Sequence, residues 1–424
     1  MPEKDIPEPS RSTPTSFTST LDDEVMDRPK QAQLNSIQAM RGVAAILVVV
    51  SHIILSLRPQ IRHADIKPPE WLQHGFNVGA CGVDLFFIIS GFIIVYVTSR
   101  SKSGLLGCRD FVIKRLIRIY PTYWFFLLFS IGGLVIRAQL SSEMYAGDRF
   151  PIAIPWIIRS IFLFPAYKPG GSQDFGPLLG PGWTLSFELF FYAVFAVCLC
   201  TIRSTKLRAQ SVAAISVTLG CLGTIFADQL IEIPVLRMVT HPLLFEFAFG
   251  CLLATQCERL AKLRFSVSVS LVSVGLGLLV FDHIYQLHPG KLGLTRPIIY
   301  GVPCGLLFTG IVSAELRGML NVHRWLIAIG DASYATYLSH SAITLKVLGI
   351  AWLTTGFYHQ TPLLVVLLLN LAACLVVGQL FYYLVEIRMI NGLRAWCLPM
   401  RASPSNVSSP SSPNESAPAS AHNG

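Results

Sequence analysis

Apolar residues are grouped in runs of about twenty along most of the chain, and short polar segments separate the runs. Each run is long enough to cross a hydrocarbon core of about 30 Å as a helix. The pattern therefore predicts an all-α polytopic membrane protein, a bundle of about ten transmembrane helices. We expect these helices at residues 37–57, 78–97, 120–136, 181–200, 211–227, 238–256, 265–283, 297–314, 332–355 and 362–386.

Polar segments flank the apolar region on both sides. Residues 1–35 are rich in Pro, Ser, Thr and acidic residues and lack the apolar stretch of a cleaved signal peptide. Residues 402–424 are dominated by Ser, Pro and Asn and have little to bury. We expect a disordered cytoplasmic tail at 1–35 and a low-complexity cytoplasmic tail at 391–424 around a transmembrane domain at 36–390.

The composition supports a membrane protein, since 52% of the residues are hydrophobic and 13% are charged, against about a quarter charged in soluble domains. Ten cysteines are scattered without metal-ligand spacing, so we expect no metal. The net charge of +9 raises the question of nucleic acid. However, Lys and Arg are concentrated in alternate loops, which predicts that these loops and both termini are cytoplasmic. We therefore expect no nucleic-acid partner.

Two polar residues on the first helix point to chemistry. Arg41 lies near its cytoplasmic end, and His52 follows eleven residues later, about 16.5 Å along the axis and on nearly the same face. Charged and titratable residues are costly inside a membrane, and they usually have a function there. The alternative is that Arg41 reaches the lipid headgroups and that His52 is a hydrogen-bonded structural residue.

Two acidic residues are expected at the depth of His52. Asp84 and Glu188 lie on helices that enter from the outside, so either carboxylate could orient the imidazole, as in hydrolytic triads. Ser186 lies beside Glu188. Trp183 lies there too, and it also fits an interfacial aromatic belt. Asp84 fits equally well as a residue at the start of a helix.

A second group is expected near the cytoplasmic side. Arg115 and Arg118 are three residues apart on one helical face, and paired arginines can bind phosphates. Alone, they would be read as positive-inside anchors, but Arg41 is expected at the same level. His340 is a second intramembrane imidazole, and Tyr334 precedes it on the same helix. This two-level arrangement suits a phosphorylated cytosolic donor whose reactive end meets an acceptor across the membrane.

The long outer segment at 137–180 contains "FPAYKPGGSQDFGPLLGPGW". We expect it to be a loop that contacts sugar, because long loops in compact domains are often functional.

Several motifs resemble the acyltransferase-3 family of bacterial integral-membrane O-acyltransferases. They are "MRGVAAILVVVSH", "GVDLFFIISGF", "RLIRIYPTYW", "GWTLSFELFFY" and "SYATYLSH". The form "GWTLSFE" and the length are most similar to the exopolysaccharide-production acetyltransferase branch. The resemblance implies acyl transfer from an acyl-CoA, with acetyl-CoA favoured, His52 as the key catalytic residue, and Arg41, Arg115 and Arg118 serving the donor. The family often has proline where "VEIRM" has Arg388, which leaves the role of Glu386 open.

The hypothesis is an O-acyltransferase of the bacterial inner membrane that transfers an acetyl group to a cell-surface polysaccharide or its precursor. Its partners would be acyl-CoA, a glycan or lipid-linked oligosaccharide acceptor, and membrane lipids. A secondary transporter or lipid-linked glycan flippase is the alternative, because intramembrane His, Asp and Glu also form proton relays.

Overall fold

The computed structural model describes residues 34–63, 79–101, 103–144, 154–169, 175–287, 294–357 and 361–398. The compact unit of the chain begins at Asn35. Most of both expected tails, at 1–33 and 399–424, lies outside the described residues.

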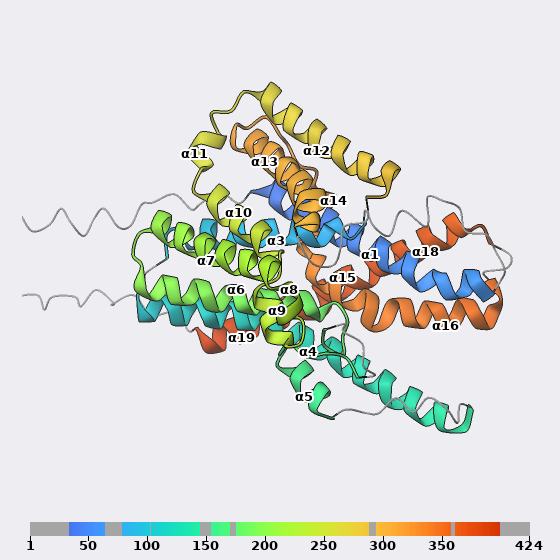
Figure 1. Cartoon of the computed structure of the whole chain (residues 1–424). Coiled ribbons are helices and arrows are strands. Elements are labelled where there is room, and N and C mark those ends of the chain that lie inside the picture. The colour runs from blue at the N-terminus through green and yellow to red at the C-terminus, as the bar shows by residue number, and fades with distance from the viewer. Residues whose placement is uncertain are drawn as a thin grey trace, which may run out of the picture. The chain divides into compact units, whose positions relative to one another are not determined.

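Helices make up the regular structure of the described residues, apart from one isolated antiparallel bridge between Tyr167 and Phe175 (Figure 1). In chain order they are α1 (Asn35–His63), α3 (Cys81–Thr98), α4 (Leu105–Met144), α5 (Ile154–Ile161), α6 (Gly182–Thr201), α7 (Thr205–Ile225), α8 (Ala227–Leu230), α9 (Pro234–Val239), α10 (Leu244–Ala254), α11 (Cys257–Leu260), α12 (Phe265–Tyr285), the π-helix η2 (Pro297–Gly301), α13 (Val302–Leu316), α14 (Arg324–Asp331), α15 (Ser333–Ser339), the π-helix η3 (His340–Thr344), α16 (Leu345–Thr355), α18 (Leu363–Phe381), the π-helix η4 (Tyr382–Glu386) and α19 (Ile387–Cys397).

Eight helical segments in the described ranges are long and apolar enough to cross a membrane. They correspond to eight of the ten expected helices, and α7 and the continuous α15–η3–α16 segment occupy the other two positions. The final helix continues through α19 to Cys397, beyond its expected end. The prediction of an all-α polytopic membrane protein is thereby confirmed.

Helix α4 is longer than expected in both directions. It begins at Leu105 rather than near residue 120, because Lys and Arg are good helix formers and the basic stretch continues the helix. It also continues to Met144, and α5 follows from Ile154, so the expectation of one loop at 137–180 is wrong. Pro121 lies inside α4, three residues after Arg118.

Side chains of α4 hold the segment after α5 in place. The Tyr123 hydroxyl donates to the Ser160 carbonyl at 2.6 Å, and the Trp124 indole donates to the Ile161 carbonyl at 2.9 Å. Both carbonyls lie at the end of α5, so that the chain leading into α6 starts from a fixed point.

Glycines allow α3 and α10 to pack backbone against backbone. A Cβ at Gly91 would lie 2.1 Å from the Phe247 carbonyl oxygen, and a Cβ at Gly250 would lie 2.1 Å from that of Ile88. Small residues at such crossings are typical of membrane helices. The contact fixes α3, which forms one wall of the site described below.

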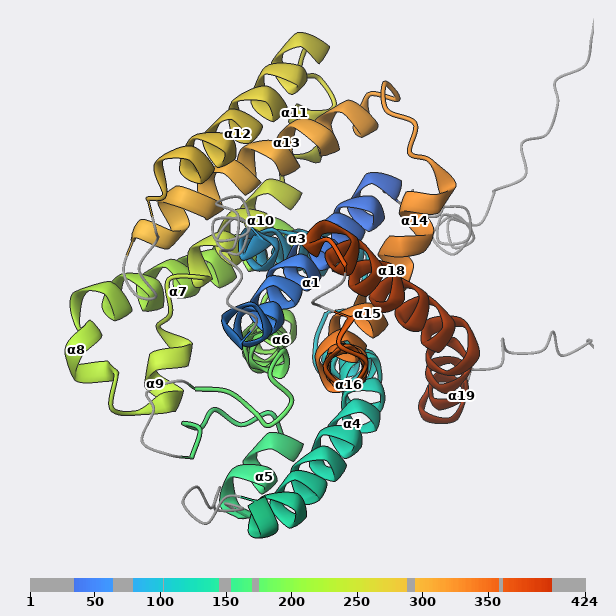
Figure 2. The same ribbon diagram turned by 90° about the vertical axis from the view of Figure 1, so that its right-hand side faces the viewer.

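Helix α15 is enclosed by α1, α4 and α18 (Figure 2). The start of α1 is fixed from α13, where the Glu315 carboxylate accepts from the Asn35 and Ser36 amides at 2.7 and 3.0 Å. Helix α1 carries His52, and His340 is the first residue of η3, directly after α15.

Candidate active site

A pocket with an empty volume of about 940 Å³ opens between α1, α3, α4, α6 and α15. Its lining includes Arg41 from α1, Arg115 and Arg118 from α4, Glu188 from α6 and Tyr334 from α15. The three arginines that the sequence assigned to the donor are therefore brought together.

Aromatic rings support two of these guanidinium groups. Arg115 lies over Phe111 and Tyr192, with 5.3 and 5.2 Å from its guanidinium carbon to the ring centroids. Arg118 lies 5.8 Å from the centroid of Tyr334. Among the described residues, neither guanidinium is ion-paired with a carboxylate. A stacked guanidinium keeps its N–H edge available, so both side chains can still bind an anion.

Two carboxylates accompany the arginines. Glu188 accepts a hydrogen bond from the Tyr192 hydroxyl at 2.6 Å. Glu386 is fully buried and interacts electrostatically with Arg118 and Arg41. No hydrogen-bond partner of its carboxylate is found among the described residues. Glu386, whose role the sequence left open, therefore belongs to the arginine side of the site.

The other side of the pocket leads to the histidines. Thr184 and Tyr337 line the pocket, and their hydroxyls are hydrogen-bonded at 2.8 Å. The Tyr337 ring centroid lies 6.0 Å from that of His340, and His340 lies 5.0 Å from His52 in an edge-to-face contact. Neither histidine lines the pocket; the Tyr337 hydroxyl bonds to Thr184 and to the Pro181 carbonyl, and its ring separates the pocket from His340.

Backbone carbonyls fix the tautomers of both imidazoles. Nδ1 of His52 lies 2.8 Å from the Val48 carbonyl oxygen, and Nδ1 of His340 lies 3.2 Å from that of Thr336. Because a carbonyl only accepts, each Nδ1 carries the hydrogen, and each neutral ring keeps its lone pair on Nε2. His340 is fully buried, whereas His52 is half-buried. Both Nε2 atoms are therefore available as bases.

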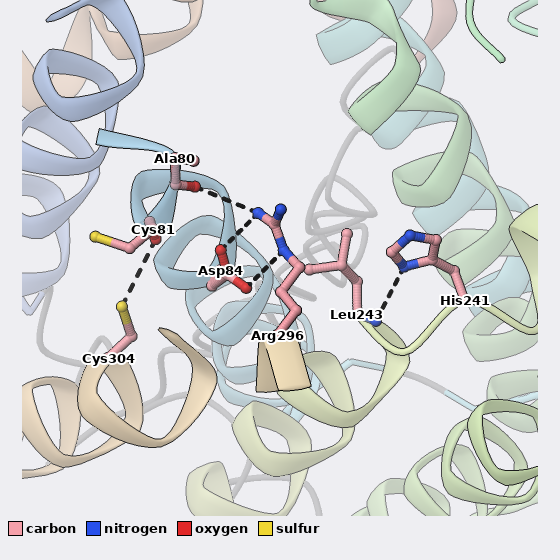
Figure 3. Close-up of polar contacts among 7 residues, drawn as sticks. All are labelled: Ala80, Cys81, Asp84, His241, Leu243, Arg296 and Cys304. Atoms are coloured by element: carbon pink, nitrogen blue, oxygen red, sulfur yellow. Dashed lines mark hydrogen bonds and ion pairs between the residues drawn. The ribbon is translucent and has the colours of Figure 1, made fainter. Parts of the chain in front are cut away.

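The expected pairing of Asp84 or Glu188 with His52 is not found. Asp84 is fully buried and forms a two-point ion pair with Arg296, in which Nη2 lies 2.7 Å from Oδ2 and Nε lies 3.1 Å from Oδ1 (Figure 3). A buried carboxylate needs a cation or hydrogen-bond donors, and Arg296 supplies them. The Val48 carbonyl orients His52 in place of a carboxylate.

Two further sequence candidates lie outside the pocket lining. The Ser186 hydroxyl donates to the Leu163 carbonyl at 2.7 Å. Trp183 packs edge to face against Phe175 and Phe187, with ring centroids 6.3 and 5.8 Å apart. Both side chains hold the segment before α6 in place, and neither contacts the arginines or the histidines in the contacts described.

The sequence interpretation missed the partners of the charged residues. Phe111 precedes Arg115 by four residues, and Tyr192 follows Glu188 by four, a spacing that places side chains together on a helix. This signal could have identified both. Arg296 carried no such signal, because 212 residues separate it from Asp84. In the described ranges no three His, Cys, Asp or Glu side chains are grouped to hold a metal ion.

The fold and the site define a polytopic helical membrane protein in which an arginine-lined pocket adjoins two imidazole bases. The model of the acyltransferase-3 family, described as an acyltransferase domain, matches residues 34–383. The chain therefore belongs to the acyltransferase-3 family, and it is a multi-pass membrane O-acyltransferase.

Curated relatives support this class. The exopolysaccharide production protein ExoZ of Rhizobium meliloti is 29% identical over 287 residues, which cover 68% of this chain and 83% of the relative. The acyltransferase MdmB of Streptomyces mycarofaciens is 25% identical over 331 residues, which cover 74% of this chain and 79% of the relative. Nodulation protein 10 of Rhizobium leguminosarum is 28% identical over 198 residues, covering 43% of this chain and 51% of the relative. No solved structure matches the chain significantly.

Proposed function

We propose that this protein transfers an acetyl group from acetyl-CoA to a sugar hydroxyl of a cell-surface polysaccharide or of its lipid-linked precursor, at the bacterial inner membrane. The observation that carries this proposal is the convergence of Arg41, Arg115 and Arg118 in one pocket, whose lining residue Tyr337 packs against the histidine pair.

The arginine side suits the phosphates of the donor. Three guanidinium groups offer planar donor edges to phosphate oxygens, and aromatic stacking holds two of them in place. The phosphates would lie near the arginines while the pantetheine arm extends towards Thr184 and Tyr337.

The imidazole side suits the acyl transfer itself. Nε2 of His52 would take the proton of the sugar hydroxyl as its oxygen attacks the thioester carbonyl. The new C–O bond forms, the C–S bond breaks, and CoA leaves as the thiol once its sulfur is protonated. A positioned general base typically contributes about 10²–10⁴-fold to the rate. Direct transfer predicts that donor alone leaves no acyl label on the protein, and label retained on His52 would instead show an acyl-histidine intermediate.

The chemical class of the acceptor and the orientation of the protein in the membrane are supported by different observations. The printed name of the relative ExoZ refers to exopolysaccharide production, which supports a glycan acceptor for this chain. The Lys and Arg bias supports a cytoplasmic position for the arginine side, both termini and the donor. The acceptor would then reach His52 from the outer side.

The decisive experiment uses purified full-length protein in nanodiscs with labelled acetyl-CoA, measuring donor binding and the CoA released as water takes the place of the sugar hydroxyl. His52→Ala should lower turnover about 10²–10⁴-fold and keep donor binding. Arg115→Ala should weaken donor binding. Lys114→Ala is the matched control, because Lys114 is exposed on the same helix and does not line the pocket.

Normal turnover in a well-folded His52→Ala variant would contradict the role of His52. Equal loss of donor affinity in Arg115→Ala and Lys114→Ala would contradict the specific role of the pocket. Failure of the wild-type protein to bind the donor would reject the acyl-CoA reading and favour transport, which flux measurements would then test.

A further inference from the structure

A second imidazole lies between the pocket and His52. His340 is fully buried, one helical turn after the pocket residue Tyr337, and its ring touches that of His52 edge to face. Nδ1 of His340 donates to the Thr336 carbonyl, while no partner for its Nε2 is found among the described residues. The molecule therefore buries a basic nitrogen beside the pocket without pairing it.

The local backbone holds this imidazole in place. The α-helical pattern of α15 changes to the π-helix η3 at His340, and short π-helices occur frequently at functional sites. Behind it, α18 approaches so closely that a Cβ on Gly378 would lie 2.1 Å from the Thr336 hydroxyl oxygen. An unpaired buried polar atom costs free energy, so this arrangement is more simply explained if Nε2 meets a group that arrives during the reaction.

We infer that His340 is the second proton carrier of the acyl transfer and protonates the departing CoA sulfur. This inference rests on the function proposed above. The proton leaves the sugar hydroxyl for Nε2 of His52, passes to the unpartnered Nε2 of His340 as the rings turn to bring these two nitrogens together, and ends on the sulfur. One O–H and one C–S bond break, one C–O and one S–H bond form, and both histidines return to their neutral state.

The positions of the two rings assign the two tasks. The sulfur would arrive with the pantetheine arm from the pocket, and His340 is the imidazole next to the pocket residue Tyr337. His52 is half-buried, whereas His340 has no exposed surface, so His52 is the imidazole open to an acceptor. A single imidazole would have to reach both the sugar hydroxyl and the CoA sulfur. Two imidazoles in contact can each serve one of these groups.

His340→Asn is the informative variant. The Asn amide nitrogen can replace Nδ1–H as the donor to the Thr336 carbonyl, but Asn supplies no base in place of Nε2. The full-length variant is first compared with wild type for monodispersity and thermal unfolding in detergent. His340→Gln is measured in parallel, so that a failure of one variant to fold leaves the other.

Two acyl donors with different leaving groups distinguish a loss of proton delivery in His340→Asn from a general loss of activity. Acetyl-CoA has a weakly acidic thiol that needs a proton to leave. S-(4-nitrophenyl) thioacetate has a far more acidic thiol that leaves as the anion. We expect His340→Asn to lose about 10²–10⁴-fold of turnover with acetyl-CoA and to stay close to wild type with the aryl thioester. His52→Ala should be slow with both donors.

A second readout applies if wild type does not use the aryl donor. The solvent deuterium isotope effect on acetyl-CoA turnover should be present in wild type and absent from the residual activity of His340→Asn.

Three results would overturn the inference: full acetyl-CoA turnover in folded His340→Asn, an equal loss with both donors, or an unchanged isotope effect. Wild-type protein that releases no CoA under any condition would instead reject the proposed function, and the inference would fall with it.

Discussion

At the scale of single residues, Arg296 supplies the positive charge beside two buried acidic side chains. It holds Asp84 in a two-point ion pair, and Glu246 is buried close enough to interact electrostatically with both. Arg296→Met would leave two buried carboxyl groups without a cation. Removing one partner of a buried pair costs about 3–5 kcal/mol, so we expect a clearly lower unfolding temperature in detergent.

Arg203→Met is the control for this prediction, because Arg203 is exposed in the short connection before α7. Its unfolding temperature should stay close to that of wild type. If the two variants unfold at the same temperature, the Asp84–Arg296 pair does not stabilise the bundle, and a functional role for Asp84 would have to be reconsidered.

The Tyr192 ring stacks on a pocket arginine that we propose to bind the donor. It lies under the Arg115 guanidinium, and its hydroxyl is bound to Glu188. Tyr192→Leu removes the ring, and we expect acetyl-CoA affinity to fall by the equivalent of about 0.5–2 kcal/mol. Tyr192→Phe keeps the ring and loses only the hydroxyl. Calorimetric titration of both variants would contradict the stacking argument if Phe weakened binding as much as Leu.

At the scale of the element, the α3–α10 contact depends on two glycines. Ala at Gly91 or Gly250 would place a methyl group 2.1 Å from a facing carbonyl oxygen, so the helices would have to move apart. Overpacking typically costs about 1–3 kcal/mol. We expect either variant to unfold at a lower temperature. Gly277→Ala on α12 is the control, because its Cβ would meet no atom within 4 Å, and an equal shift there would contradict the packing argument.

The positions of the elements were predictable because each span must bury about twenty apolar residues. The start of α4 was not predictable, because a basic stretch such as that around Arg115 fits both a loop and a helix extending beyond the membrane. The grouping of the three pocket arginines followed from their depth along the helices. The environment of Asp84 did not, since depth says nothing about the direction in which a side chain points.

Each of the three described π-helices has a charged or titratable residue at or next to one of its ends. Arg296 immediately precedes η2, His340 begins η3, and Glu386 ends η4. Each of these residues is a charged or titratable group that hydrophobic periodicity alone would not place. A π-turn shifts the register of all following side chains, and a 3.6-residue pattern in the sequence does not reveal it. Residues after each π-turn therefore face a direction that the pattern does not give, whereas the ring contact of His340 with His52 depends on how two distant helices pack.

At the scale of the whole molecule, the arrangement predicts the side of the membrane from which each substrate enters. The arginine pocket would open to the cytoplasm and the half-buried side of His52 would face outwards, so donor and acceptor would enter from opposite sides. Sealed inside-out vesicles that contain the protein should therefore release CoA from added acetyl-CoA, which does not cross lipid. Right-side-out vesicles should do so only after detergent is added. Vesicles with His52→Ala give the background rate, and equal CoA release by both kinds of sealed wild-type vesicle would contradict the predicted orientation.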